Sequence, residues 1–199
     1  MKQDKHKDKK KAGCGRIAVL FPGIGYTCDK PLLYYGGKLA AGLGYEVVPV
    51  PYGHFPKGVK GDPEKMHRCM ESALAQAEEM LEEIRWEDYA DIVFLGKSIG
   101  TAVAVRYAAA HGLRAGCVLY TPLVETFSEG LCDAIAFHGT ADPWADTTRI
   151  KALCEEAGIP LYMTENANHS LETGDLDIDI PTIRETMKRT REYLLPRAE

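Results

Sequence analysis

Short, uninterrupted apolar runs that recur along the chain constrain its fold more than any other feature. One of them reads Ile92-Val93-Phe94-Leu95, without the apolar–polar alternation of a strand that has one face in water. Such runs indicate strands buried on both faces, and stretches with helical spacing of apolar residues separate them. The alternation predicts an α/β fold in a single domain, with a mainly parallel sheet and helices on both faces.

Glycine, proline and polar residues mark where these elements end. The longest helical stretch has Pro63 in its first turn and Asp62 as a candidate N-cap. We expect about six strands, with cores at 16–21, 45–50, 90–95, 116–120, 134–137 and 159–163. The expected helices lie at 31–43, 63–86, 99–111, 146–157 and 181–195.

The first residues differ in character from everything that follows. The segment 1–11 holds six lysines and two aspartates, with no apolar residue after Met1. It cannot bury apolar surface to offset the entropy of ordering. We therefore predict a disordered basic tail at 1–15 and a folded domain at 16–199. A solubilising leader is the simplest interpretation, with a weak nucleic-acid or membrane contact as the alternative.

Length and charge exclude several classes of protein. A chain of 199 residues can bury a core without disulfides or metals. Its formal net charge is −5, and outside the lysine-rich segment it carries 18 basic and 27 acidic residues. Nucleic acid is therefore not an expected partner, because phosphate contacts need a basic face.

Two further compositional features bear on localisation. No apolar run approaches the ~20 residues that span a bilayer, and no apolar segment follows the charged start as a secretion signal requires. None of the six cysteines forms a C-x-x-C pair, and their spacing matches no zinc site. We expect a reduced cytoplasmic protein without a membrane partner.

The loop after the third expected strand carries the strongest chemical signal. It reads Gly96-Lys97-Ser98-Ile99-Gly100 and joins a buried strand to a helix. That is the context of a G-x-S-x-G nucleophile elbow, in which a sharp turn presents the serine at the top of the sheet. The backbone N–H of Ile99 would lie at a helix N-terminus, where negative charge is stabilised.

A nucleophilic serine needs a base that an acid orients. Asp142 follows the fifth expected strand, and His169 follows the sixth. The carboxyl ends of parallel strands share one edge of a sheet, so we expect Ser98, Asp142 and His169 to meet there. Their order along the chain is that of the α/β-hydrolases.

From about 16 to 195 the sequence resembles a small α/β-hydrolase, near the lidless dienelactone-hydrolase-like and esterase-like members. The resemblance is carried by Gly96–Gly100 and by the segments 138–142 and 168–170. It implies six strands in the order 4-3-5-6-7-8 of the family's numbering, in which this chain's first strand is the family's third, and no cap domain. Dienelactone hydrolase itself has a cysteine nucleophile, so its substrate is not implied here.

The resemblance also implies roles for single residues. Ser98 would be the nucleophile, His169 the general base and then acid, and Asp142 the residue that orients it. The loop at 21–25 matches the family's oxyanion loop, so the N–H groups of Ile24 and Ile99 would hold the oxyanion. In that loop a proline stands at position 22, where many relatives carry histidine.

Each of these residues has a plainer interpretation. Ser98 could be an ordinary helix N-cap. His138 is a competing base that better fits a packing role, and Glu125 is the main alternative acid. Asp133 and Asp146 are weaker rivals, and Asp146 more plausibly caps the helix that follows it. A P-loop is excluded, because position 91 is not glycine.

Aromatic residues and one lysine beside these loops are candidates for a substrate pocket. Tyr26, Tyr52 and Trp144 could form its wall or only pack at its rim. Lys97 could attract an acidic substrate, or be only a solvated or ion-paired side chain. We expect a hydrolase of small esters or thioesters, monomeric or homodimeric, that needs no metal or organic cofactor. A prolyl-oligopeptidase-type peptidase and a non-catalytic binding protein of hydrolase fold are the alternatives.

Overall fold

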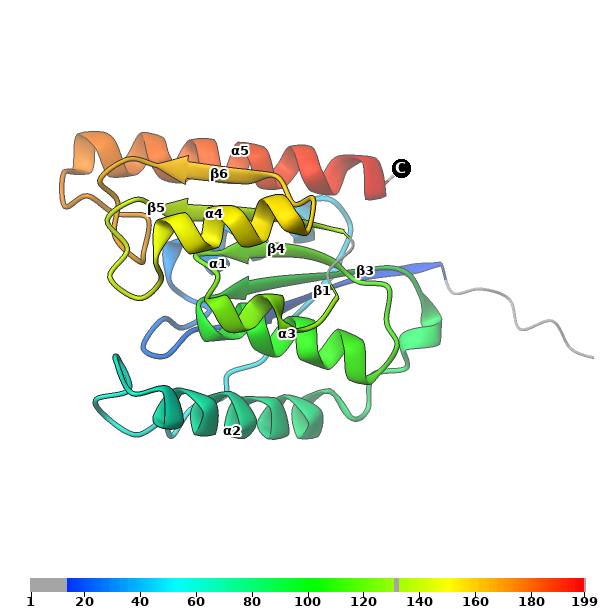
Figure 1. The fold of residues 1–199 in the computed structure, drawn as a ribbon. Helices are drawn as coiled ribbons and strands as arrows, with labels where there is room; N and C mark the ends of the chain where they lie inside the picture. Colours follow the sequence, from blue (N-terminus) through cyan, green and yellow to red (C-terminus); the bar gives the residue numbers. More distant parts are fainter. Residues whose placement is uncertain (1–13, 131–132, 199) are drawn as a thin grey trace, which may run out of the picture.

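The computed structural model describes residues 14–130 and 133–198. Almost all of the predicted tail, and the thiol at position 132, lie outside these residues. One sheet forms the centre of the molecule (Figure 1). Its six strands run in the order β2-β1-β3-β4-β5-β6, and all five neighbouring pairs are parallel. The strands are β1 (Gly15–Phe21), β2 (Glu46–Pro49), β3 (Tyr89–Lys97), β4 (Gly116–Tyr120), β5 (Ala134–Gly139) and β6 (Leu161–Thr164).

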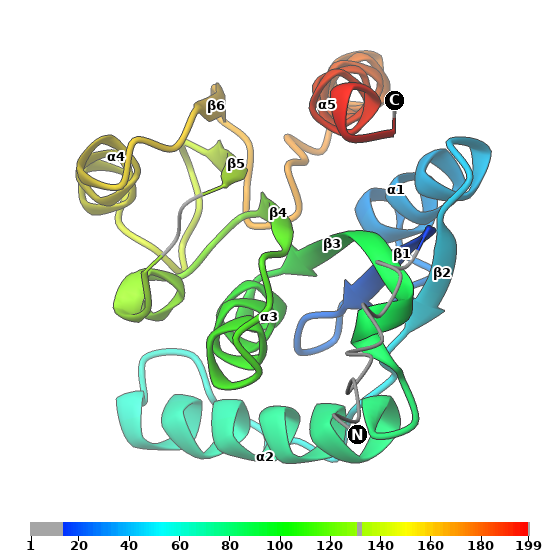
Figure 2. The same ribbon diagram turned by 90° about the vertical axis from the view of Figure 1, so that its right-hand side faces the viewer.

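Helices cover both faces of the sheet, as predicted (Figure 2). The helices α1 and α5 lie on one face, while α3 and α4 lie on the other, with α2 packed outside α3. The helices are α1 (Pro31–Gly42), α2 (Pro63–Leu81), α3 (Ile99–Ala110), α4 (Thr147–Glu156) and α5 (Leu176–Ala198). No cap domain covers the sheet in the part of the chain that the structure describes, and the strand order is the one that the resemblance implied.

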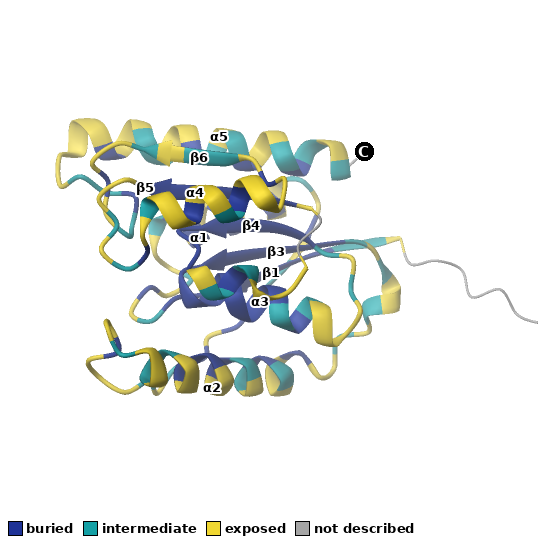
Figure 3. Cartoon of the chain, in the orientation of Figure 1, coloured by how far each residue is buried: buried dark blue, intermediate teal, exposed yellow. Residues whose placement is uncertain are grey.

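The hydrophobic core forms two layers, one on each face of the sheet. Phe94 belongs to the layer under α2, α3 and α4, whereas its neighbour Leu95 belongs to the layer under α1 and α5. The central strands are therefore buried on both faces, while the edge strand β6 is partly exposed (Figure 3). Among the described residues, no helix is long and apolar enough to cross a bilayer.

Two predicted helix boundaries were wrong. The helix expected at 63–86 ends at Leu81, and Trp86 starts a separate 3₁₀ turn. The last helix begins at Leu176, five residues before Pro181. Asp175 sets that start, because its side chain accepts the N–H of Asp177 at 2.9 Å. A capping aspartate thus overrides the tendency of proline to mark the first turn.

Candidate active site

The turn between β3 and α3 holds Ser98 in a strained conformation. Its φ and ψ angles are 57° and −124°, outside the regions that non-glycine residues favour. The flanking glycines make the turn possible. A Cβ on Gly96 would lie 2.7 Å from the Thr101 Cα, and a Cβ on Gly100 would lie 2.1 Å from the Phe21 carbonyl oxygen. The backbone therefore approaches too closely for any side chain at these two positions.

Ser98, His169 and Asp142 form one continuous hydrogen-bonded chain. The Ser98 Oγ lies 2.7 Å from the His169 Nε2, and the His169 Nδ1 lies 2.7 Å from the Asp142 Oδ2. The Ser98 side chain makes no capping hydrogen bond to α3, so the plain N-cap interpretation of this serine is not supported. Asp142 also accepts the backbone N–H of Trp144 at 2.8 Å, which fixes its carboxylate.

The rival residues lie in other environments. Asp146 caps α4 by accepting the Arg149 N–H at 2.8 Å. Asp133 lies directly before β5, at the opposite end of that strand from Asp142, and accepts the Tyr193 hydroxyl at 2.8 Å. His138 is fully buried, with its Nε2 3.0 Å from the Thr147 Oγ1 and its Nδ1 3.8 Å from the Asp142 Oδ2. It therefore packs behind the acid rather than against the serine.

Three residues that the sequence did not single out as site residues position the loop of His169. Thr121 leaves β4 with a φ of 46° and donates its hydroxyl to the His169 carbonyl at 3.0 Å. The Asn168 Oδ1 accepts the N–H of Ser170 at 2.7 Å, an Asx turn around the histidine. A Cβ on Gly139 would lie 2.3 Å from the Ala167 carbonyl oxygen, so β5 and this loop meet backbone to backbone.

Burial and charge together set the protonation of the site. Burial lowers the pKa of His169, and nearby Lys97 and His138 lower it further, while the hydrogen bond and charge of Asp142 only partly oppose them. Burial alone would raise the pKa of Asp142. The hydrogen bond and charge of His169 and the Trp144 N–H outweigh it, so this pKa falls below its usual value. At neutral pH the pair is therefore a neutral imidazole beside a carboxylate.

The loop after β1 lies against Ser98. Gly23 and Tyr26 exchange backbone hydrogen bonds of 2.9 and 3.2 Å in a tight turn. A Cβ on Gly23 would come within 3.1 Å of the Ser98 Cβ, which shows how closely this turn approaches the elbow. The hydroxyl of Tyr52 donates to the Pro22 carbonyl at 2.7 Å and braces the loop. The turn brings Ile24 to the rim of the site, while Ile99 follows Ser98 directly as the first residue of α3.

A small cavity of about 170 Å³ lies over Ser98. Trp144 is one of its walls and stacks on His169, with ring centroids 5.5 Å apart. Tyr52 instead lines an adjoining cavity of about 560 Å³, which shares Ile24 with the first. The cavity over Ser98 is lined by Ile24, Gly25, Tyr26, Met66, Lys97, Ser98, Trp144, His169 and Ser170.

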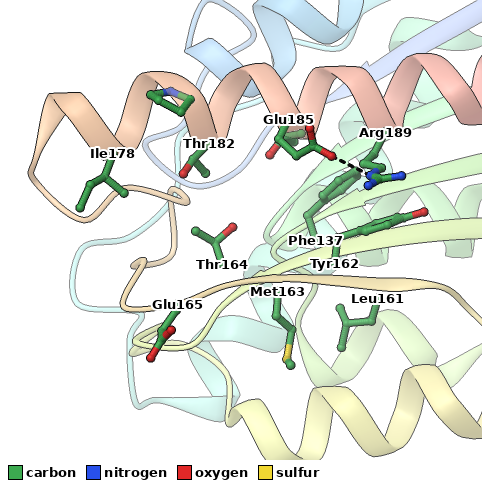
Figure 4. A pocket seen from close by; sticks show the side chains of 12 residues that line it. Phe137, Leu161, Tyr162, Met163, Thr164, Glu165, Ile178, Thr182, Glu185 and Arg189 are labelled. Carbon is green, nitrogen blue, oxygen red and sulfur yellow. Dashed lines mark ion pairs between the residues drawn. The ribbon is translucent and has the colours of Figure 1, made fainter.

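A larger cavity elsewhere is lined by none of the three residues of this hydrogen-bonded chain. It has a volume of about 640 Å³ and lies between β6 and α5, where Figure 4 shows Glu185 paired with Arg189. Neither Ser98 nor its two partners line it, so volume alone does not mark the site. In the part of the chain that the structure describes, no cluster of three or more His, Cys, Asp or Glu residues could hold a metal ion.

Known structures share this architecture, although no protein-family model and no curated protein sequence matches the chain. A proposed hydrolase of the α/β superfamily from Xanthomonas campestris pv. campestris superimposes with a TM-score of 0.66 over 91% of this chain and 99% of that one, at 14% identity. The fold is that of the α/β-hydrolases. An α/β serine hydrolase without a lid from Xanthomonas campestris gives a TM-score of 0.63 over 95% and 85% of the two chains, at 14% identity. An esterase of Pyrococcus furiosus gives 0.64 over 93% and 82%, at 12% identity.

Proposed function

We propose that this α/β-hydrolase-fold protein is a serine hydrolase that cleaves small esters or thioesters through an acyl-enzyme. One observation carries the proposal: Asp142, His169 and Ser98 form an unbroken hydrogen-bonded chain that ends on a strained serine beneath a cavity. A serine held in this way beside a neutral imidazole is an activated nucleophile. The solved structures of similar fold include an esterase and a serine hydrolase without a lid, which adds support.

The reaction would run in two halves. The His169 Nε2 takes the Ser98 proton while Oγ attacks the substrate carbonyl, and the N–H groups of Ile24 and Ile99 hold the oxyanion. The tetrahedral intermediate collapses, and His169 gives the proton to the departing alcohol or thiol. Water then attacks the acyl-enzyme, loses a proton to His169, and releases the acid as Ser98 regains its proton. Asp142 stays ionised throughout and steadies the imidazolium.

The shape of the site favours a small acyl group. Its cavity of about 170 Å³ is well below the ~300–1,000 Å³ of typical drug-sized ligand sites. The adjoining cavity, which is lined by Tyr52 and has a volume of about 560 Å³, gives the leaving group a wider exit. No cofactor enters this scheme, because the acid, the base and the nucleophile are all side chains of the chain.

Covalent labelling tests the proposal directly. A fluorophosphonate probe should label the wild type on Ser98, and Ser98→Ala should lose both the label and the hydrolysis of short-chain esters. Ser128→Ala, at an exposed serine after β4, is the matched control and should keep both. Equal labelling of the wild type and Ser98→Ala would overturn the proposal. Folding without ester or thioester turnover would instead favour a binding protein of the same fold.

A further inference from the structure

Lys97 is a buried lysine at the site, and the proposed reaction does not use it. It is the last residue of β3, directly before Ser98, and it is 1% exposed. Its Nζ lies 4.9 Å from the centroid of the Tyr26 ring. Nowhere in the described residues does this Nζ have a hydrogen-bond or ion-pair partner within the usual distances. The interpretation of Lys97 as a solvated or ion-paired side chain is therefore wrong.

The carboxylates around Lys97 do not neutralise it at close range. Asp142 and Glu172 act on it only through longer-range attraction, and Asp142 already accepts hydrogen bonds from His169 and Trp144. Burial is the stronger influence and lowers the pKa of Lys97 to about 7. An unpaired ammonium in such a place is costly, and an apolar side chain of similar length would avoid that cost.

The cavity that Lys97 shares with Ser98 is suited to an anion. None of the residues that line it is acidic, so nothing in its wall repels a negative charge. At the rim, the Nζ of Lys60 lies 5.9 Å from the ring centroid of Trp144, but Lys60 is exposed, so solvent screens its charge. A ligand carboxylate at this depth would supply the counter-charge that Lys97 lacks, in surroundings where little water screens the attraction.

We propose that Lys97 determines specificity by binding a carboxylate on the acyl part of the substrate, so that the preferred substrates are half-esters or half-thioesters of short dicarboxylic acids. The inference rests on the proposed function, because it needs an acyl group on Ser98. The small cavity limits the chain to a few carbons between the two carboxyl groups, as in a succinyl group. The leaving group remains outside and contributes little to selection.

Two esters of matched acyl length test the proposal. Monoethyl succinate carries the carboxylate and ethyl butyrate lacks it, and alkyl esters avoid the self-cleavage that a neighbouring carboxylate causes in aryl half-esters. Acid release at pH 7 gives kcat/KM for each. The wild type should prefer the succinate ester at least tenfold, and Lys97→Met should reduce this ratio at least tenfold, whatever its absolute activity.

Lys60→Met is the control for general positive potential. Its ratio should change less than threefold, because Lys60 is exposed and its charge is screened. A wild-type ratio near one, a ratio that survives Lys97→Met, or an equal loss in Lys60→Met would each overturn the assignment of Lys97.

Binding to Ser98→Ala separates this inference from the proposed function. Calorimetry on this variant, which lacks the serine hydroxyl, should show that monoethyl succinate binds at least tenfold more tightly than ethyl butyrate, and that the added Lys97→Met change removes the difference. If neither ester is cleaved by the wild type and the probe does not label Ser98, the proposed function fails, while Lys97-dependent binding of monoethyl succinate would still support the anion site. If ethyl butyrate is cleaved but succinate has no advantage in either assay, only the present inference fails.

Discussion

The charged side chains at the two ends of the parallel strands differ in whether they have partners. At the amino ends of the strands, Arg197 donates to Asp91 at 2.8 Å and also pairs with Asp133. Tyr45 and Tyr193 donate their hydroxyls to the same two carboxylates. At the carboxyl ends, Lys97 has no partner at hydrogen-bond distance among the described residues, and Ser98 is strained.

This difference separates stability from chemistry. Arg197 is already paired with two carboxylates, so it helps to hold α5 against the strand ends and has no free charge to bind a ligand. An unpaired charge and a strained serine lower stability, and such features concentrate where a protein acts on another molecule. We therefore expect substitutions at the carboxyl ends of the strands to lower activity, and substitutions at the amino ends to lower stability.

The largest effect on activity is expected at Asp142. Asp142→Asn keeps the size of the side chain but removes the charge that, in the proposed mechanism, orients His169 and stabilises its imidazolium. Loss of this function lowers kcat by about 10³–10⁴-fold in a serine triad. Initial rates on ethyl butyrate measure it.

Asp146→Asn is the control for this substitution. Asparagine also caps helices, so α4 and the rate should both be unchanged. Retention of more than a tenth of kcat in Asp142→Asn would contradict the proposed role of Asp142 and reopen the choice of acid.

The next effect is on folding, at the elbow. Gly100→Ala places a Cβ 2.1 Å from the Phe21 carbonyl oxygen, which is a backbone atom of a central strand and cannot move away. We expect a loss of more than about 3 kcal/mol in the free energy of unfolding, since overpacking against backbone is among the most destabilising changes. Urea unfolding followed by circular dichroism measures it.

Gly42 gives the matched comparison. It is the last residue of α1, and a Cβ there meets nothing within 4 Å. Gly42→Ala should raise stability by up to about 1 kcal/mol, because alanine loses less backbone entropy on folding. Similar stabilities for the two variants would show that the elbow can relax, contrary to the close approach described above.

A smaller loss of stability is expected at the amino ends of the strands. Arg197→Met leaves Asp91, whose side chain is 13% exposed, without its cation. Breaking a fully buried pair costs about 3–5 kcal/mol, and partial exposure reduces this to about 2 kcal/mol. The urea midpoint should fall while kcat on ethyl butyrate stays the same. If Arg197→Met lowered activity but not stability, the amino ends of the strands would not have the purely structural role that we infer.

The sequence could predict what local patterns determine. Apolar runs located all six strands. In the four inner strands, burial on both faces leaves no polar residue within the strand core, and the partly exposed edge strands β2 and β6 are short but still mostly apolar. The placement of Asp142 and His169 directly after strands predicted that they would share an edge with Ser98, and the structure brings the three together. The elbow glycines were visible as a motif.

Other features depend on tertiary contacts that no local pattern records. Thr121 has a positive φ without any sequence signal for it, and Gly139 is needed only because the loop of His169 crosses its backbone. Of the three residues that position the loop of His169, Asn168 alone had a local signal, since an asparagine directly before the histidine favours an Asx turn. The sequence left open whether Lys97 attracts an acidic substrate or is solvated or ion-paired, because no local pattern records that its Nζ lies over the Tyr26 ring.

The smallest expected effect is a shift in the pH dependence of kcat/KM, caused by the charge of Lys97 acting on His169. Burial lowers the pKa of His169, and the charge of Lys97 lowers it further, against the pull of Asp142. Because the base must be neutral, kcat/KM for ethyl butyrate should fall on the acid side at a pH below the ordinary histidine value. The pKa of Lys97 is about 7, so this lysine is mostly charged across the acid limb of the pH profile.

Lys97→Met removes the charge but keeps the burial, so the acid limb of the pH profile should move to higher pH, while Lys60→Met leaves it in place. An unmoved limb would mean that burial and His138 alone depress the pKa of His169, and that the unpaired charge serves the ligand but not the base.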